Sequence, residues 1–365
     1  MNIRAVTECL EQVAPVHLQE DYDNAGLLIG NGKEECTGVL VTLDVTEETI
    51  GEAVRKKCNL VVAHHPVIFR GLKRLNGKNY VERVVLAAVK SDVAVYAIHT
   101  NLDNVLEGVN FKIAQKINLQ HLRTLSPRDG LLRKLVTFCP TADAPGVRKA
   151  LFEAGAGSIG KYSDCSFTAA GTGSFTAGAG TTPYVGQIGI GHEEPESRIE
   201  VIYPVNIENK VLQALQSAHP YEEIAYDLYP LVNRQTTVGS GLIGDLPAAV
   251  SESELLAMLK EAFGLSMIRH SPYLGKKIST IAVCGGAGSF LIGAAKTAGA
   301  GAFITADLKY HEFFDADQTI LLADIGHFES EQFTVELLTD ILRQKFPNFA
   351  VLKTETNTNP VHYFL

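Results

Sequence analysis

The fold class follows from one stretch of the sequence, residues 37–65, which reads TGVLVTLDVTEETIGEAVRKKCNLVVAHH. Its first nine residues are nearly all apolar, as in a strand that is buried on both faces of a sheet. The following segment, 46–57, places Thr46 and Thr49 as in a capping box and ends in basic residues, which is typical of a helix. Residues 60–63, LVVA, predict a second strand. This strand–helix–strand order predicts a parallel sheet covered by helices.

The same alternation continues on both sides of a different central region. After residue 65, the sequence predicts a helix over 80–90 and a strand over 93–100. Near the C-terminus it predicts strands over 279–286, 302–307 and 318–326, with helices over 290–299 and 327–346. We therefore expect the two outer segments to form two halves of one parallel-sheet α/β unit.

The central region has another order of elements. It predicts strands over 131–140, 198–206 and 223–231, helices over 145–155 and 210–218, and a Gly/Thr/Ser-rich stretch over 162–183. This order is typical of the split βαβ, or ferredoxin-like, α+β arrangement. The expected organisation is an N-terminal half of the α/β domain over 1–127, an inserted ferredoxin-like domain over 128–235, and the C-terminal half of the α/β domain over 236–365.

Composition excludes several classes of protein. The 365-residue chain has 32 basic and 41 acidic residues, and without a basic block it is not expected to bind nucleic acid. It contains no window of 18 apolar residues and no signal-peptide core at its start, so no membrane association is expected. Its six cysteines form no C-x-x-C pair and are expected to be free thiols. A cytoplasmic protein is the expectation.

Candidate ligands for a metal follow the predicted strands of the outer segments. They form three groups: His64 with His65, His99 with Asp103, and His327 with Glu331. Each group also has an ordinary explanation, as a helix surface pair, a turn residue or a structural imidazole. Ligands bind at the carboxyl ends of the strands in open parallel sheets, so the three groups should converge. Their combination favours a metal site.

The types of side chain indicate what this site would hold. With His99 set aside as a structural imidazole, three histidines, one aspartate and one glutamate remain, and this set without a thiolate suits zinc, iron or manganese. Five side chains exceed the needs of one open catalytic ion and suit two divalent ions. Neighbouring residues of an extended chain point in opposite directions, and Pro66 holds His65 extended. His64 and His65 are therefore expected to serve different ions.

Two weaker signals concern the substrate. The sequence CGGAGS, residues 284–289, follows a predicted strand and opens a helix, which makes Gly286, Gly288 and Ser289 candidate phosphate contacts. His99 is a candidate for a proton-transfer role, with a structural imidazole as the alternative. GSGLIG, residues 239–244, matches a dinucleotide fingerprint but does not lie at a strand-to-helix turn, so no dinucleotide site is expected.

Five motifs together resemble the GTP cyclohydrolase 1 type 2 homologs, also called Nif-three-like proteins. They are YDNAGLLIG (22–30), TLDVT (42–46), VVAHHP (61–66), HTNLD (99–103) and GHFESE (326–331). The resemblance covers both outer segments and implies a toroidal homohexamer with two metal ions in each chain. The residues that match the family's ligands are His64, His65, Asp103, His327 and Glu331. The resemblance implies that Glu331 bridges both ions, that His65 and Asp103 bind one, and that His64 and His327 bind the other.

The central region carries a second resemblance. HPYEEIAYDLYPL, residues 219–231, is similar to the C-terminal strand region of CutA and PII-like proteins, which some longer members of the family contain. His219 is expected to be structural in this region.

The expected function is that of a dinuclear metal-dependent hydrolase, similar to GTP cyclohydrolase 1 type 2, that acts on a nucleotide or another phosphorylated small molecule. Zinc is the expected metal, with iron and manganese as alternatives. The family name implies that a purine ring is opened with release of formate. The alternative is a non-catalytic, metal-binding hexameric ring with a regulatory, scaffold or metal-handling role.

Overall fold

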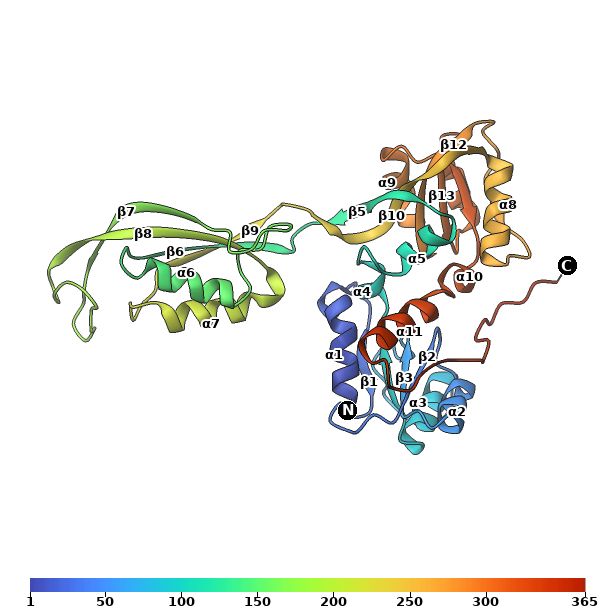
Figure 1. Cartoon of the computed structure of the whole chain (residues 1–365), viewed down its shortest axis with the longest axis horizontal. Helices are drawn as coiled ribbons and strands as arrows, with labels where there is room; N and C mark the ends of the chain where they lie inside the picture. The colour runs from blue at the N-terminus through green and yellow to red at the C-terminus, as the bar shows by residue number, and fades with distance from the viewer. Residues whose placement is uncertain (365) are drawn as a thin grey trace. The chain divides into compact units, whose positions relative to one another are not determined.

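A computed structural model describes residues 1–364, and its chain divides into two compact units (Figure 1). The outer unit comprises residues 1–127 together with the chain from Thr236 onward, and the inserted unit comprises residues 128–235. The fold is mixed α/β with several sheets. None of the helices among the described residues is both long and apolar enough to cross a membrane.

The first sheet of the outer unit contains the strand predicted from residues 37–45. Its strands, in spatial order, are β1 (Gly26–Ile29), β4 (Ala94–Ala97), β3 (Leu60–Ala63), β2 (Val39–Thr42) and β15 (Val351–Lys353). Side chains alternate between its faces, so Leu40 and Val61 pack with helices α2 (Glu47–Arg55) and α3 (Tyr80–Lys90), whereas Val41 and Val62 face α1 (Ile3–Val13) and α11 (Thr334–Lys345). Helices therefore cover both faces of the sheet.

The second sheet contains the C-terminal strands. Its spatial order is β11 (Arg269–His270), β14 (Leu321–Asp324), β13 (Ala302–Ala306), β12 (Lys277–Ala287), β10 (Gln235–Ser251) and β5 (Gln120–Arg128). One face packs against α9 (Ile292–Thr297) and the short helix η4 (Tyr310–Ala316). The other packs against α5 (Val109–Lys116), α8 (Glu252–Phe263) and α11.

The expectation of purely parallel sheets was wrong. Strands β2, β3, β4 and β15 are parallel, as are β12, β13 and β14. However, β1 is antiparallel to β4, β10 to β12, and β11 to β14. Parallel neighbours need a crossover connection, usually a helix, whereas antiparallel neighbours have no such requirement. Each sheet is therefore parallel in its centre and mixed as a whole.

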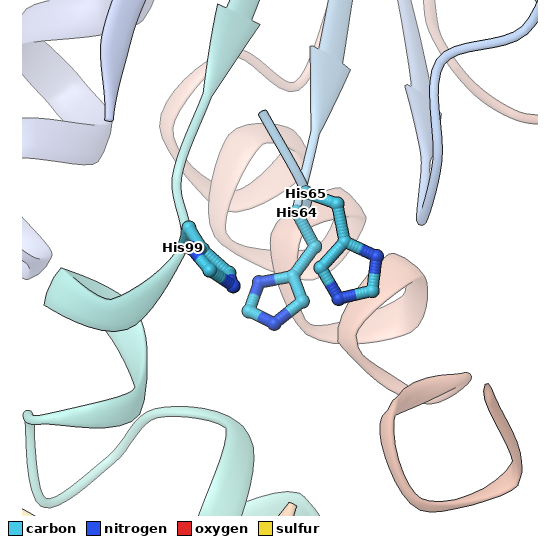
Figure 2. Close-up of side chains that lie close together, drawn as sticks. All are labelled: His64, His65 and His99. Atoms are coloured by element: carbon cyan, nitrogen blue, oxygen red, sulfur yellow. The ribbon is translucent and has the colours of Figure 1, made fainter. Parts of the chain in front are cut away.

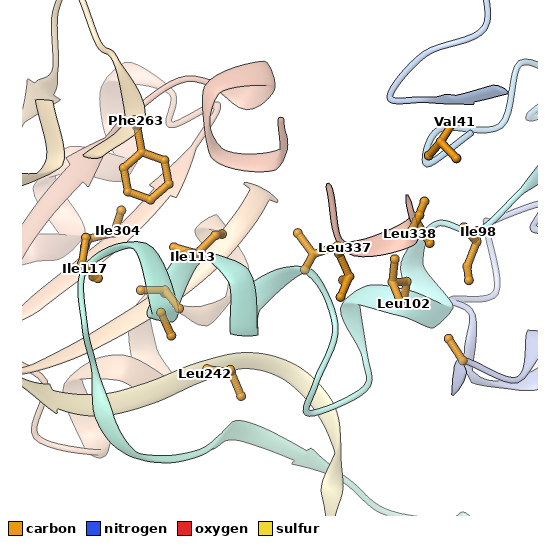
Figure 3. Close-up of a cluster of buried hydrophobic side chains, with 14 of the residues drawn as sticks. Val41, Ile98, Leu102, Ile113, Ile117, Leu242, Phe263, Ile304, Leu337 and Leu338 are labelled. Atoms are coloured by element: carbon orange, nitrogen blue, oxygen red, sulfur yellow. The ribbon is translucent and has the colours of Figure 1, made fainter. Parts of the chain in front are cut away.

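Helix α11 joins the two sheets through one hydrophobic core (Figure 3). Its side chains Leu337 and Leu338 lie between the region of Val41 and Ile98 on one side and that of Ile113 and Ile304 on the other. The single long helix expected over residues 327–346 is instead two helices, α10 (His327–Glu331) and α11. Between them, the side-chain amide of Gln332 donates to the carbonyl oxygens of Phe263 and Glu329.

The remaining short helices of the outer unit connect these elements. They are η1 (Val16–Leu18), α4 (Thr100–Asp103) and η3 (Ser289–Leu291).

The inserted unit is a four-stranded antiparallel sheet with two helices on one face (Figure 1). The spatial order is β7 (Phe167–Thr176), β8 (Gly191–Pro204), β6 (Leu132–Pro140) and β9 (Tyr226–Leu231). The helices are α6 (Ala144–Glu153) and α7 (Glu208–Ala218), with η2 (Val205–Ile207) before α7. Strand β7 lies in the Gly/Thr/Ser-rich stretch and was not predicted, because its composition is that of a loop. Strand β7 forms through its antiparallel hydrogen-bond ladder with β8.

We expect the outer unit to fold and bind metal without the inserted unit. The chain leaves the outer unit through β5 and returns through β10, which are neighbours in one sheet, and the Thr124 hydroxyl donates to the Thr236 carbonyl at 2.8 Å. A short Gly/Ser linker in place of residues 128–235 should therefore close the gap without strain. Elemental analysis and thermal unfolding of this variant measure the outcome. Loss of metal or of cooperative unfolding would refute it.

Candidate metal centre

The ends of the central strands bring the candidate side chains together. His64 and His65 directly follow β3, and His99 follows β4 (Figure 2). The centres of the His64 and His65 rings are 4.9 Å apart, and the ring of His99 lies 5.3 Å from His64 and 5.4 Å from His65. His327 joins them from the start of α10, with its ring centre 5.2 Å from that of His65. Four imidazoles thus share one site.

The carboxylate of Glu331 lies in the middle of this group and is almost completely buried. Its Oε2 atom is 2.9 Å from Nε2 of His65 and 3.1 Å from Nε2 of His327. Its Oε1 atom is 3.8 Å from Nε2 of His64, and Oδ1 of Asp103 is 3.7 Å from that nitrogen. The distances place His65 beside His327 and His64 beside Asp103, which differs from the pairing implied by the family resemblance.

Local backbone structure explains how these side chains are placed. The amide of His64 donates to the Thr42 carbonyl and that of His65 to the Leu43 carbonyl, so both residues continue the β2–β3 ladder. Gly286 makes room for Glu331 on the other side. Its φ is +61°, and a Cβ atom there would lie 2.4 Å from Oε1 of Glu331. Glycine is therefore required at position 286.

All four histidines have their Nδ1 atoms engaged on the far side from the cluster. Nδ1 of His64 bonds to the Ile98 carbonyl at 2.8 Å. The corresponding partners are carboxylates for the others: Asp44 for His65 at 2.8 Å, Asp23 for His99 at 2.8 Å, and Asp307 for His327 at 2.6 Å. Histidines that ligate metal ions nearly always have such a partner on the second nitrogen, which fixes the tautomer and the orientation of the ring.

These three aspartates were not among the predicted site residues. Asp44 and Asp307 follow β2 and β13 closely, so the rule that found the histidines also applies to them. Asp23 precedes the antiparallel strand β1 and has no such signal. It also accepts hydrogen bonds from the amide and hydroxyl of Thr100. Burial opposes ionisation of Asp23, but the bonds from His99 and Thr100 outweigh it and lower its pKa to about 2.

Buried polar atoms without a protein partner show that the cluster suits a metal ion. Among the described residues, Nε2 of His64 and Oδ1 of Asp103 are buried and accept or donate no hydrogen bond. Buried polar atoms rarely stay unpaired, so each such atom calls for a ligand. Two sets of donor atoms lie close enough to hold an ion: His64, His65 and His99, and His65, His327 and Glu331.

The ionisation of the cluster also indicates that it attracts positive charge. Burial lowers the pKa of His65, but hydrogen bonds with Asp44 and Glu331 outweigh it and raise the pKa to about 9. Burial likewise opposes a charged His327, yet Asp307 and Glu331 raise its pKa to about 11. Burial and the charge of Glu331 raise the pKa of Asp103 well above its usual range. The carboxylates therefore favour protonated imidazoles in the protein without metal. A bound divalent ion would supply this positive charge in place of the protons.

The backbone amides of two of the three expected phosphate contacts have hydrogen-bond partners within the protein. The amide of Gly286 donates to the Ser330 hydroxyl and that of Gly288 to the Thr305 hydroxyl, both at 3.0 Å. Neither amide is therefore available to an anion. Ser289 begins η3, a helix of only three residues. His219, in the inserted unit, bonds to the Phe138 carbonyl and accepts from the amide of Tyr221, so both its ring nitrogens are engaged.

The cluster opens into a cavity of about 950 Å³ within the outer unit. Segments that follow strands of the first sheet and residues of the second sheet line it, together with residues of the C-terminal segment between Thr358 and Tyr363. The hydroxyl of Thr358 donates to Asp44 at 2.8 Å, which ties this segment to the partner of His65. A small molecule in this cavity would contact the metal ligands directly.

Comparison with known proteins decides the family. Residues 1–360 match the family described as Duf34/NIF3 (NGG1p interacting factor 3). The chain belongs to the DUF34/NIF3 family. Two relatives are each called GTP cyclohydrolase 1 type 2 homolog. The one from Bacillus subtilis is 35% identical over 99% of this chain and 98% of its own length, and that from Halalkalibacterium halodurans is 37% identical over 98% of each.

Solved structures agree with this assignment. A Bacillus cereus protein related to NIF3 has a TM-score of 0.82 and 35% identity, covering 100% of this chain and 99% of its own. Staphylococcus aureus protein SA1388 has a TM-score of 0.81 and 27% identity, with the same coverage. The family resemblance inferred from the five motifs is confirmed. The cluster of histidines lies in the outer unit of this chain.

We expect Asp44→Asn to weaken metal binding by about 10- to 100-fold, because Asp44 orients His65 and increases its basicity. Competition with a chromophoric zinc chelator measures the affinity. The matched control is Asp340→Asn, which changes an exposed carboxylate on α11. An affinity equal to that of the control variant would show that Asp44 does not support the site.

Proposed function

We propose that this DUF34/NIF3 protein is a metal-dependent hydrolase of the kind named in its relatives, acting on a small molecule. Two divalent ions, with zinc expected and iron or manganese as alternatives, would be held by His64, His65, Asp103, His327 and Glu331. The observation that supports this proposal is the cluster of four inward-facing imidazoles around a buried carboxylate, open to a cavity. Such ions lower the pKa of bound water and polarise the bond that it attacks.

The chain's own residues would orient and supply protons to this site. Asp44 and Asp307 hold His65 and His327 through their Nδ1 atoms, and so direct Nε2 toward Glu331. His99 lines the cavity without contacting Glu331, and Asp23 engages its Nδ1 atom. Its Nε2 atom remains to accept or donate a proton to the substrate. This is the proton-transfer role for which the sequence made His99 a candidate.

The proposal extends to the cell and to assembly. The six cysteines are free thiols, which supports a reducing, cytoplasmic location. The exposed aromatic side chains of Tyr310 and Phe314 support contacts between copies, in the homohexamer that the family resemblance implies. The inserted unit, with its split βαβ order of strands, would be the CutA/PII-like part of each chain. The mass of the particle in solution tests the hexamer.

A turnover screen tests the hydrolase. The metal-loaded protein is incubated with GTP, followed by formate release and loss of purine absorbance, and with a panel of nucleosides and phosphoesters. Activity should vanish with a chelator, return with Zn²⁺ or Mn²⁺, and be absent in His65→Ala. If no compound turns over while both ions stay bound, the non-catalytic metal-binding ring is the correct function.

A further inference from the structure

The cavity beside the metal cluster is strongly acidic. Seven carboxylates line it, and two of them, Asp324 and Glu329, lie outside the contacts with the histidines described above. The only cationic side chain among the described lining residues, apart from the histidines, is that of Arg269. With Glu20 set aside, two divalent ions and this arginine would supply five positive charges against the negative charges of six carboxylates. The site keeps a negative balance even when it is loaded.

Arg269 is already committed to other acceptors. Its Nη1 atom donates to Asp324 at 3.1 Å and its Nη2 atom to the Leu308 carbonyl at 2.6 Å. Its guanidinium also lies 5.2 Å from the centre of the Phe313 ring. Sites that bind phosphate chains rely on arginine or lysine side chains or on free backbone amides. Here the lysines are absent from the described lining, and the amides of Gly286 and Gly288 are occupied.

The apolar part of the lining includes six aromatic side chains beside aliphatic ones. Tyr22, Phe69, Tyr80, Phe290, Phe328 and Tyr363 contribute rings to the wall. The ring of Phe69 meets that of His99 edge to face, with the centres 5.7 Å apart, so an aromatic surface reaches the metal cluster itself. Aromatic walls favour planar ligands, since offset-stacked and edge-to-face contacts are stabilising.

We infer that the site takes a planar, uncharged or cationic ring compound, such as a nucleoside or free heterocyclic base, and discriminates against a polyphosphate chain. This inference rests on the proposed function and narrows its substrate. The carboxylates would repel each phosphate that the ions do not contact, and the one arginine of the described lining already donates to Asp324 and to the Leu308 carbonyl. A nucleoside triphosphate would therefore bind more weakly than the corresponding nucleoside.

Calorimetry on the full-length, metal-loaded protein in magnesium-free buffer compares guanosine, pterin, GMP and GTP. We expect guanosine or pterin to bind at least about tenfold more tightly than GTP, since like charges repel strongly at low dielectric. GTP binding as tight as that of the neutral rings would overturn the inference. So would the absence of binding by both neutral rings up to their solubility limits.

Two variants separate the charge from the stacking surface. Glu329→Lys should strengthen GTP binding by about tenfold and change guanosine binding little, because it replaces a cavity carboxylate by a cation. Phe69→Leu should weaken binding of the neutral ring by roughly two- to tenfold. Its control is Phe167→Leu, which changes an exposed ring of the inserted unit outside the cavity. If both test variants retain their metal content and bind guanosine and GTP with the same ratio of affinities as the unaltered protein, the inferred ligand class is wrong.

The ratio of the affinities for the neutral ring and for GTP is measured without turnover. A result that contradicts this inference is therefore distinct from a result that contradicts the proposed hydrolase. A protein that prefers neutral rings but converts none would retain the ligand class and lose the proposed reaction. A protein that hydrolyses GTP and binds it more tightly than guanosine would retain the hydrolase and lose this inference.

Discussion

Protein carrying Glu331→Gln should retain at most one divalent ion per chain, whereas the unaltered chain should carry about two. Glu331 is the one carboxylate that approaches three histidines, through Oε2 to His65 and His327 and through Oε1 to His64. Glutamine has the same shape but lacks the negative charge, and one of its two terminal atoms is a donor that cannot bind a metal. Elemental analysis of protein purified without chelators measures the ion content.

The matched control is Glu329→Gln, two positions earlier on the same short helix. The Oε1 atom of Glu329 accepts from the side chain of Asn359 and approaches none of the four histidines in the described contacts. This variant should keep its full ion content. If Glu331→Gln also keeps two ions, Glu331 is not a bridging ligand and the dinuclear site is wrong.

Removal of the metal should lower the melting temperature by roughly 5–11 °C. An ion present at 100 times its dissociation constant stabilises the folded state by about 2.7 kcal/mol. For a unit of this size, each kcal/mol corresponds to about 2–4 °C. The reason lies in the buried carboxylates: without an ion, burial and the charge of Glu331 oppose ionisation of Asp103, and a bound ion would relieve this repulsion.

Differential scanning calorimetry with a chelator, followed by addition of zinc, measures this shift. The Glu331→Gln variant serves as the control, because a protein that has lost its ions should show little further response to the chelator. A melting temperature that does not change when the ions leave would mean that the cluster contributes nothing to folding stability.

Strand-end reasoning predicted the ligand group because it depends on local patterns. His64 and His65 end an apolar run, and His327 and Glu331 are four residues apart, so a short helix presents both on one face. The structure brings these four and Asp103 into one cluster. Their role as ligands remains a proposal that the metal measurements above test.

Features that depend on distant partners were not predictable. Asp23 reaches His99 from a loop 76 residues away, and its sequence context is that of an ordinary turn. Strand β15 pairs with β2 across most of the chain, and its three residues carry no pattern of their own. The hydrogen bonds of the Gly286 and Gly288 amides depend on Ser330 and Thr305, which the glycine-rich motif by itself does not indicate.

The division of the ligands between the two ends of the chain has a consequence for biosynthesis. His64, His65 and Asp103 leave the ribosome early, but Glu331 follows Asp103 by 228 residues. At about 5–20 residues per second, roughly 11–46 s separate their emergence. During that interval the nascent chain exposes an incomplete site and an unpaired edge at β2, since β15 comes last. The proposed pair of ions would therefore be selected only after translation is nearly finished, when the cell's free metal pool and chaperones act on an almost complete chain.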